Sequence, residues 1–374
     1  MSRSDASIEI RDLYKIFGNN PKQYVGAVRS GLSKSELSNA HEHILGLSNI
    51  NISIPAGKIQ VIMGLSGSGK STLIRHINRL IEPTSGSIMI NGRDILNMSE
   101  LDLREFRRDQ TAMVFQNFAL LPHRTVIDNV TFGLEVRGID KAKSRETGMR
   151  WIDRVGLLGF ETRYPTELSG GMRQRVGLAR ALSNDASILM MDEAYSALDP
   201  LIRTDMQTML LELQSELRKT VVFITHDLDE ALRLGDQIVI LRDGSIVQQG
   251  DSQSILLNPA DDYIERFVKD VNRGRFIRVD TIMDPVGLSK RSVLPHLKSG
   301  SSLEAAAKVL TNSSSDIGIV TGDSDQPLGM VSLRQITAAL SSATLPIDVT
   351  VHTDDLAWGP RCAGPRSAVK AMDH

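Results

Sequence analysis

The stretch "VIMGLSGSGKSTLIRHIN", which runs from Val61 to Asn78, decides the fold. It begins with a short apolar run, continues with residues rich in glycine and serine, and ends with apolar residues at helical spacing. This order predicts a buried strand, a tight turn and the start of a helix. The question it raises is what the turn between the strand and the helix binds.

The turn, "GLSGSGKST", has the residue spacing of a phosphate-binding loop. Its glycines let successive backbone N–H groups converge on phosphate oxygens, and the following helix presents its N-terminus to the same anions. Lys70 is predicted to reach the β- and γ-phosphates of a nucleotide, and the Ser71 hydroxyl to ligate Mg²⁺. The alternative is a chance Gly/Ser turn, which the flanking strand and helix disfavour. The predicted phosphate-binding residues are Gly64, Leu65, Ser66, Gly67, Ser68, Gly69, Lys70, Ser71 and Thr72.

Length, charge and cysteine content narrow the class of protein. The 374 residues suffice for two or three domains. The formal net charge of −2 shows no excess of basic residues of the kind that nucleic-acid-binding proteins usually have. The single cysteine, Cys362, cannot form an internal disulfide. The N-terminus lacks the apolar segment of a signal peptide, and no apolar run approaches the length that spans a bilayer. We therefore expect a soluble, cytoplasmic chain whose membrane role, if any, comes through partners.

Further apolar runs extend the sheet that the first strand begins. "ASILMMDEA" (Ala186–Ala194) and "TVVFITHD" (Thr220–Asp227) are typical of strands buried in a parallel sheet, and "DQIVILRDGSIVQQG" (Asp236–Gly250) predicts an antiparallel hairpin. Helical spacing dominates from residue 125 to about 182. The predicted fold is an α/β domain over residues 1–270, with a mostly parallel sheet, an antiparallel part and a helical subdomain.

Changes in composition along the sequence mark an insertion near the N-terminus and further units after residue 270. Residues 19–43 form a polar insertion whose end, "SKSELSNAHEHIL", predicts a short helix. Residues 271–280 are predicted to be a linker. Residues 281–345 follow the order helix, strand, strand, helix, and residues 346–374 begin a similar unit in which prolines and glycines oppose a helix. The second unit is therefore predicted to be incomplete or irregular.

An acidic pair ends the strand in "ILMMDEA". Asp192 is suited to hold Mg²⁺, and Glu193 to take a proton from an attacking water molecule. Alone, an Asp-Glu pair at a strand end is most often a solvated turn. Because a phosphate loop precedes it in a parallel sheet, we favour the catalytic interpretation.

A second anion site is predicted at Ser169, Gly170 and Gly171, which precede a helix in "ELSGGMRQRVGLARAL". One chain has no need of two γ-phosphate sites. This suggests a dimer in which each copy caps the nucleotide held by the other. The alternative is an ordinary serine N-cap before a basic amphipathic helix.

The order and spacing of these motifs resemble an ABC-transporter ATPase subunit. The residues that carry the resemblance are "GLSGSGKST", the glutamine in "VFQNFAL", "LSGGMRQ", "ILMMDEA", "SALDP" and "ITHD". The resemblance spans residue 8 to about residue 270. It implies a P-loop NTPase fold that binds ATP and Mg²⁺ and hydrolyses ATP to ADP and phosphate.

The resemblance also implies a role for each matching residue. Phe17 is expected to stack on adenine, with Tyr14 as a weaker candidate, and Gln116 to contact Mg²⁺ and water and to face a membrane subunit. His226 is expected to sense the γ-phosphate. The Walker A loop is Gly64–Thr72. The remaining implied roles are the signature residues Ser169, Gly170 and Gly171, the Walker B pair Asp192 and Glu193, and the D-loop acid Asp199.

The polar insertion and the C-terminal unit narrow the resemblance further. Both are similar to the ATPase subunits of glycine betaine/proline betaine (quaternary amine) importers, which carry C-terminal CBS modules. The resemblance implies a homodimer bound to integral-membrane permease subunits, and indirectly to a solute-binding protein, at the cytoplasmic face of the inner membrane. It implies no nucleic-acid partner.

Other functions remain open at this point. The chain could serve an importer for a different small solute. It could also be a non-transport ABC ATPase of DNA repair or translation, although the long coiled coils or paired cassettes of such proteins are absent from the sequence. A regulatory module with an inactive cassette is disfavoured by the intact Lys70, Glu193 and His226.

Overall fold

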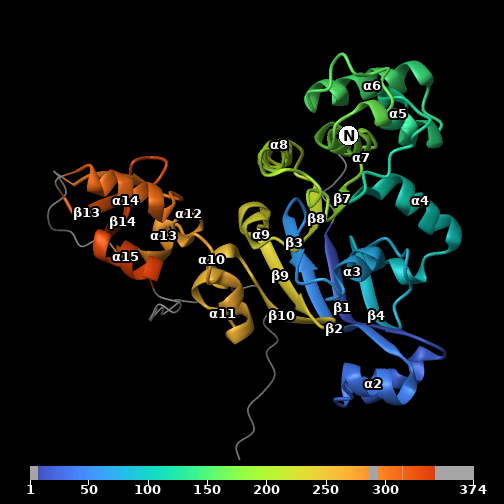
Figure 1. The fold of residues 1–374 in the computed structure, drawn as a ribbon, viewed down its shortest axis with the longest axis horizontal. Helices are drawn as coiled ribbons and strands as arrows, with labels where there is room; N and C mark the ends of the chain where they lie inside the picture. The colour runs from blue at the N-terminus through green and yellow to red at the C-terminus, as the bar shows by residue number, and fades with distance from the viewer. Residues whose placement is uncertain (1–6, 286–293, 314, 342–374) are drawn as a thin grey trace, which may run out of the picture.

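The computed structural model describes residues 7–285, 294–313 and 315–341. Figure 1 shows a larger N-terminal part built on two sheets and a smaller C-terminal part built on a third. Among the described residues, no helix is both long and apolar enough to cross a membrane.

The central sheet has six strands, all parallel except for one antiparallel edge strand. Its strands that are buried along their whole length come from continuous apolar runs, as expected for a parallel sheet covered on both faces. The order across the sheet is β10 (Ser245–Gly250), β9 (Gln237–Arg242), β3 (Ile59–Met63), β8 (Thr220–Thr225), β7 (Ile188–Asp192) and β6 (Thr111–Phe115). The predicted mostly parallel sheet with an antiparallel part is confirmed.

A second, antiparallel sheet closes the other side of helix α3 (Lys70–Ile77). Apolar residues of α3 and of both sheets form one buried cluster, so the helix after the phosphate loop is the packing layer between them (Figure 1). The order in this sheet is β2 (Ile44–Ile54), β1 (Ile8–Phe17), β4 (Ser85–Ile90) and β5 (Arg93–Asp94).

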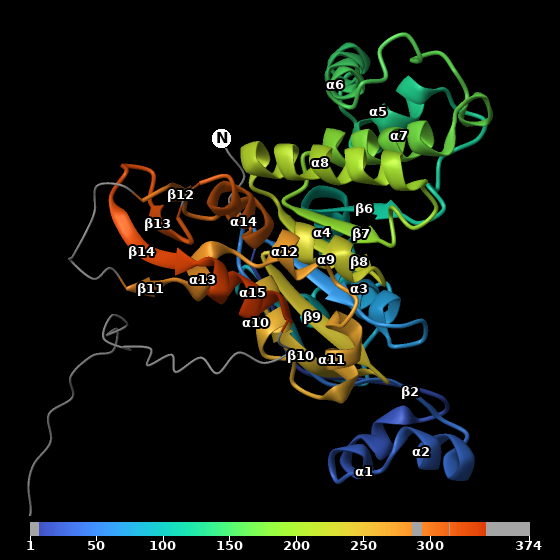
Figure 2. The same cartoon turned by 60° about the vertical axis from the view of Figure 1, so that its left-hand side comes forward.

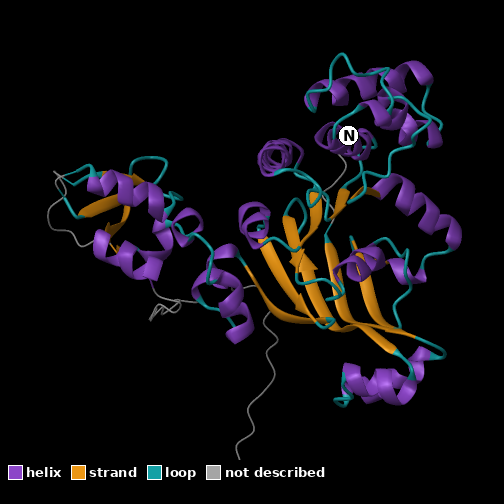
Figure 3. Cartoon of the chain, viewed as in Figure 1, coloured by secondary structure: helices purple, strands orange, loops and turns teal. Residues whose placement is uncertain are grey.

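The predicted helical region is confirmed, and its helices form a lobe at one end of the central sheet (Figure 3). Five of the helices in the N-terminal part, inside and outside this lobe, begin at a Ser, Thr or Asp whose side chain accepts a backbone N–H, which satisfies otherwise unpaired donors. They are α4 (Glu100–Gln110), α5 (Val126–Val136), α6 (Lys141–Arg154), α7 (Gly170–Ser183) and α8 (Pro200–Leu217). The other short elements are η2 (Ile95–Asn97), η3 (Pro165–Glu167) and α9 (Leu228–Leu234).

The polar insertion folds into a small helical unit between β1 and β2 (Figure 2). Its elements are η1 (Pro21–Tyr24), α1 (Val25–Arg29) and α2 (Lys34–His41). A capping box between Ser33 and Glu36 begins α2. The unit has a small apolar core of its own, in which Leu37 of α2 packs with Tyr14 of β1. The sequence predicted only the last helix of this unit.

The C-terminal part contains the predicted helix, strand, strand, helix order in residues 303–341. Two short strands flank that pair, giving the sheet order β11, β14, β13, β12. Short helices occupy the predicted linker, and α12 contacts α14 and α15. The elements that follow β10 are α10 (Ser252–Leu257), α11 (Asp262–Val268), α12 (Arg273–Phe276), α13 (Val279–Ile282), β11 (Asp284–Pro285), β12 (His296–Lys298), α14 (Leu303–Thr311), β13 (Ile317–Thr321), β14 (Pro327–Ser332) and α15 (Leu333–Ser341), of which α10 and α11 still belong to the N-terminal part. Residues 346–374, with Cys362, lie outside the described residues.

Candidate active site

The phosphate loop lies between the end of β3 and the start of α3, and its glycines are required by close backbone contacts. Gly64 has φ 151°, and a Cβ there would lie 2.3 Å from the carbonyl oxygen of Leu241 in β9. Gly69, with φ 102°, would place a Cβ 2.8 Å from the carbonyl oxygen of Gly46 in β2. The loop is thus held between two sheets by contacts that only glycine tolerates.

Lys70 is the first residue of α3, and its side chain is buried across the loop. Its ammonium donates to the carbonyl oxygens of Gly64 at 2.8 Å and Leu65 at 3.1 Å. The Ser68 hydroxyl, also buried, has no hydrogen-bond partner among the described residues. A buried cation and an unpaired buried hydroxyl within one glycine-rich turn fit a phosphate ligand.

Ser71 and Asp192 bring two oxygen donors together. The Ser71 hydroxyl donates to Oδ1 of Asp192 at 3.0 Å. Burial raises the pKa of the Asp192 carboxyl, while the hydrogen bond from Ser71 opposes that shift. A hydroxyl and a carboxylate at the end of a strand, next to a phosphate loop, form an oxygen donor set of the kind that Mg²⁺ prefers.

Glu193 follows directly and is contacted by side chains from three other segments. Its carboxylate lies 3.5 Å from the Lys70 ammonium, 3.5 Å from Nδ1 of His226, and 3.5 Å from Nε2 of Gln116. Its backbone N–H donates to the carbonyl oxygen of Ile224 in β8, and its φ is 46°. A non-glycine residue in the left-handed region is typical of strained functional positions.

Gln116 and His226 reach Glu193 from neighbouring strand ends. Gln116 follows β6 and also donates to the Ser196 hydroxyl at 3.2 Å. His226 follows β8 and is 54% exposed, so its ring is accessible to a ligand on the other side. Because the carboxyl ends of parallel strands meet at one edge of the sheet, residues far apart in sequence converge here. Ser196 was not predicted; its signal was a position three residues after Glu193, in the same turn.

Asp227 and Arg203 form an ion pair at 3.1 Å that the sequence also did not predict. Asp227 is the residue after His226, and Arg203 lies on α8. Asp199, the predicted D-loop acid, caps the same helix by accepting the N–H of Ile202. The segment after β8 is therefore tied to α8.

Phe17 lies with the phosphate loop in one cavity of about 300 Å³. Its ring is 38% exposed, whereas Tyr14 is only 5% exposed and is packed in the core of the insertion. Phe17 is thus the aromatic side chain available to a ligand, and Tyr14 is not. The residues that line the cavity are Phe17, Lys34, Ile44, Leu45, Gly46, Ser66, Gly67, Gly69, Lys70, Ser71, Thr72 and Glu193.

The second predicted anion site lies at the start of α7. The Ser169 hydroxyl accepts the N–H of Met172 at 3.3 Å, and Gly170 and Gly171 form the first turn. A Cβ on Gly171 would lie 2.6 Å from Cγ2 of Ile202, so α7 and α8 approach closely there. None of these residues lines the cavity around the phosphate loop of the same chain.

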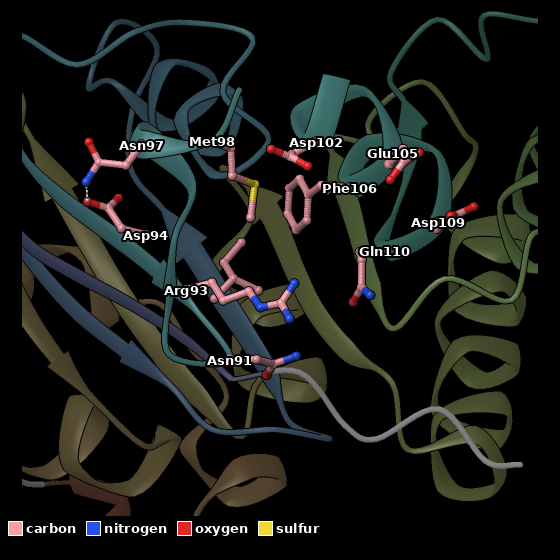
Figure 4. Close-up of a pocket in the computed structure, with 11 residues that line it drawn as sticks. Asn91, Arg93, Asp94, Asn97, Met98, Asp102, Glu105, Phe106, Asp109 and Gln110 are labelled. Carbon is pink, nitrogen blue, oxygen red and sulfur yellow. Dashed lines mark hydrogen bonds between the residues drawn. The ribbon is translucent and has the colours of Figure 1, made fainter. Parts of the chain in front are cut away.

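A separate cavity of about 760 Å³ lies between the β4–β5 hairpin and α4 (Figure 4). It contains none of the predicted site residues. Its lining is mainly acidic and amide side chains, and Asn97 donates to Asp94 within it. The lining residues are Ile90, Asn91, Arg93, Asp94, Asn97, Met98, Asp102, Glu105, Phe106, Asp109 and Gln110.

The chain is similar to known transport ATPases over most of its length. Residues 47–196 match the family model described as ABC transporter. The chain is 46% identical over 338 residues to the glycine betaine/proline betaine transport system ATP-binding protein ProV of Salmonella typhimurium, covering 90% of this chain and 83% of ProV. It is 43% identical over 325 residues to the trimethylamine N-oxide transport system ATP-binding protein TmoW of Ruegeria pomeroyi, covering 86% and 93%.

A solved structure shares the fold of about two thirds of the chain. The dimeric post-hydrolysis state of the ATP-binding cassette MJ0796, bound to ADP and Pi, matches with a TM-score of 0.56 and 30% identity. The match covers 66% of this chain and 98% of that one. Because the chain is 46% identical to ProV over 90% of its length, it belongs to the ABC transporter family, as one of its ATP-hydrolysing subunits.

Proposed function

We propose that the chain drives the uptake of a quaternary amine, such as glycine betaine or proline betaine, by binding and hydrolysing ATP. One observation carries the choice of solute class. The similarity to ProV extends over 338 residues and that to TmoW over 325 residues, so both extend beyond the ATPase domain predicted for residues 1–270. Similarity restricted to the cassette would be shared by importers of many solutes. An importer for another solute, or a non-transport ATPase, is the alternative to be tested.

The nucleotide site is assigned to the cavity that holds both Phe17 and the phosphate loop. The exposed ring of Phe17 offers a stacking surface for adenine. The backbone N–H groups of Gly64–Thr72 and the Lys70 ammonium bind the phosphates. Lys70 exchanges its two carbonyl contacts for phosphate oxygens, which are stronger, charged acceptors.

The metal site is assigned to Ser71, Asp192 and Gln116. The first two already contact each other, and Gln116 is adjacent through Glu193. Bound Mg²⁺ would neutralise charge on the phosphate oxygens. The described residues contain no group of three or more His, Cys, Asp and Glu side chains that could hold a metal. A metal in this site therefore needs hydroxyl, amide and phosphate oxygens besides Asp192.

Hydrolysis is assigned to Glu193 as the general base. Its carboxylate accepts a proton from the attacking water molecule, and Gln116 orients that water. Lys70 and His226 both contact the Glu193 carboxylate. From there they stabilise the negative charge that develops on the γ-phosphate. The N–H groups of the phosphate loop contribute in the same way.

The complete site is assigned to a homodimer. Ser169, Gly170 and Gly171 lie outside the cavity of their own chain, and a helix N-terminus with a serine cap binds anions. The similar cassette MJ0796 is dimeric in its post-hydrolysis state with ADP and Pi bound, which supports a dimer here. In the proposed dimer, the signature residues of one copy close the nucleotide site of the other.

Permease subunits are proposed to dock beside Gln116. A groove of about 500 Å³ is lined by Phe115, the residue before Gln116, and by Val136, and both of these side chains are exposed. Arginines 104, 107, 108 and 180 also line the groove. This surface is apolar with arginines around it, and Phe115 on it is followed directly by Gln116. A membrane subunit that moves against this surface would therefore displace Gln116. We also propose that the ATPase is peripheral to the cytoplasmic face of the inner membrane, and that residues 281–345 form a CBS-like module.

The proposal is tested by uptake in a strain that lacks this gene and retains its permease. Labelled glycine betaine, proline betaine, carnitine and trimethylamine N-oxide are compared, with Glu193→Gln as the inactive control. We expect the wild-type chain, and not the variant, to restore uptake of at least one of them. Restored uptake of an unrelated solute alone, or of none, would contradict the assignment.

A further inference from the structure

The insertion at residues 19–43 ends beside the nucleotide cavity. The chain leaves β1 after Phe17 and returns at Ile44, and these two residues are paired in the antiparallel register of β1 and β2. Both line the cavity, and both side chains are partly exposed. The insertion is thus anchored at the end of the cavity where the aromatic ring lies.

Lys34 is the insertion residue that enters this cavity. It is the first residue of α2, where the capping box of Ser33 and Glu36 fixes the start of the helix. Its side chain is 41% exposed and lines the cavity together with the phosphate loop. The Lys34 ammonium therefore adds to the cavity a cation that does not belong to the phosphate loop.

The present partner of Lys34 is itself attached to the phosphate loop. Its ammonium lies 3.5 Å from Oδ1 of Asp243, in the turn between β9 and β10. In that turn, the N–H of Gly244 donates to the carbonyl oxygen of Ser68 at 3.1 Å, and its carbonyl oxygen accepts the N–H of Ser48 at 2.8 Å. Lys34 therefore lies next to a turn that is hydrogen-bonded to the phosphate loop.

The ion pair between Lys34 and Asp243 is easily exchanged. Both side chains are exposed, and such pairs contribute little free energy. Asp243 keeps a second cation, because Nε of Arg242 lies 3.7 Å from its other oxygen. A phosphate oxygen would therefore compete well for the Lys34 ammonium without leaving Asp243 alone.

We propose that Lys34 is a nucleotide-binding residue that contacts the bound nucleotide at its ribose and α-phosphate. Lys70 binds the phosphates at the start of α3, and Phe17 stacks on the base. Lys34 comes from the insertion side of the same cavity, and a cation there meets the part of the nucleotide between base and terminal phosphates. The insertion thereby becomes a wall of the ATP site. The inference rests on the proposed ATP site.

The test compares nucleotide binding by Lys34→Ala, Lys34→Arg and the matched control Lys22→Ala, which removes an exposed lysine of η1 outside the cavity. Calorimetry with ATP and with ADP is the readout. We expect Lys34→Ala to weaken both nucleotides about tenfold, as for loss of one charge-assisted contact worth roughly 1.4 kcal/mol. Lys34→Arg should retain affinity within about threefold, and Lys22→Ala should match the wild type.

Steady-state kinetics provide a second readout that a purely structural role would not give. The KM for ATP should rise about tenfold in Lys34→Ala with little change in kcat, because the contact is made equally before and during hydrolysis. Wild-type affinity in Lys34→Ala, alongside lost binding in Lys70→Ala, would overturn this inference and leave the ATP site intact. Weakening of ATP alone would also overturn it, since that result places Lys34 at the γ-phosphate. If the wild-type chain binds neither nucleotide, both the inference and the ATP site fail.

Discussion

Glu193 is the residue on which the catalytic account depends. Lys70, Gln116 and His226 come from three separate segments, and each places a nitrogen 3.5 Å from its carboxylate. The positive φ of Glu193 aims the side chain at this edge of the sheet instead of continuing the strand. Such convergence on one carboxylate is what a positioned general base requires.

Replacing Glu193 with glutamine removes the base and keeps the shape of the side chain. We expect ATP turnover to fall by at least about 100-fold, because general base catalysis contributes on that order or more. ATP binding should be retained, since the phosphate loop is unchanged. Phosphate release measures turnover, and Glu212→Gln on α8 is the matched control. Turnover close to that of the wild type in Glu193→Gln would contradict the assignment.

Replacing Lys70 with alanine acts on binding. The ammonium is buried and already bonded to two carbonyl oxygens of the loop, so a phosphate would meet a pre-positioned donor. We expect ATP to bind at least tenfold more weakly, because a hydrogen bond to a charged group contributes roughly 1.5–3 kcal/mol. Calorimetry checks this, with Lys141→Ala on α6 as control. Unchanged affinity would exclude Lys70 from the phosphate site.

At the residue scale, the sequence identifies those parts of the site that are contiguous. Gly64–Thr72 forms the loop by its own spacing, and Asp192 and Glu193 are adjacent at a strand end. The contact of Gln116 with Ser196, and that of Lys34 with Asp243, join segments that only the folded sheets bring together. No local sequence pattern indicates these contacts. For this reason Ser196, Lys34 and Asp243 were not predicted at the site, and Gln116 was predicted without its contact to Ser196.

At the scale of elements, α3 carries an unusual buried group. His76 is fully buried in this helix; Nδ1 lies 2.6 Å from the carbonyl oxygen of Thr72, and Nε2 has no hydrogen-bond partner among the described residues. Since Thr72 can only accept there, Nδ1 carries the proton in the neutral ring. Burial lowers the pKa of His76 from 6.5 to about 4. The helix that begins at the phosphate loop therefore contains a histidine that stays neutral in the folded protein.

The pH dependence of stability follows from this shift. Well above pH 6.5 the ring is neutral in both the folded and unfolded states, and the full stability is present. As the pH falls toward 4, the unfolded chain binds a proton that the folded chain does not, so stability is lost. The loss at pH 5 is about 2 kcal/mol from this group alone.

His76→Gln keeps a donor for the Thr72 carbonyl and cannot titrate. Its Tm should therefore fall less than that of the wild type between pH 7.5 and pH 5, although its Tm at pH 7.5 is lower. Calorimetry at a series of pH values measures both. Parallel decreases in the two proteins would show that His76 does not titrate as described.

Element length explains which parts of the fold the sequence predicted. β3, β7 and β8 are continuous apolar runs, and the hairpin turns at Asn91 and Asp243 place glycine next to a residue with positive φ. By contrast, β11 and β12 are too short to show alternation, and α12 and α13 are single turns. Their existence depends on packing against the C-terminal sheet and its helices, which the local sequence does not encode.

At the scale of the whole molecule, the two parts share one apolar core. The largest buried cluster extends from Ile59 in β3 to Ala339 in α15. Gln253 of α10 connects them with polar contacts, donating to the carbonyl oxygen of Phe276 and accepting from the N–H of Arg278. The C-terminal part is therefore packed against the same core as the central sheet, although no sequence pattern indicated this contact.

At the same scale, we propose that a second copy of the chain completes the ATP site. Ser169 is exposed and does not line the cavity that contains its own phosphate loop, so its predicted partner is the nucleotide of another chain. A variant that binds ATP and cannot hydrolyse it should accumulate as the closed dimer, because the dimer reopens only after hydrolysis.

The most direct test is the molar mass of Glu193→Gln by light scattering, with and without Mg²⁺-ATP. We expect the single-chain mass of 41.1 kDa without nucleotide and twice that mass with it. We also expect Ser169→Arg, added to Glu193→Gln, to restore the single-chain mass at saturating ATP while circular dichroism shows an intact fold. A Glu193→Gln chain that binds ATP and keeps the single-chain mass would contradict the composite site.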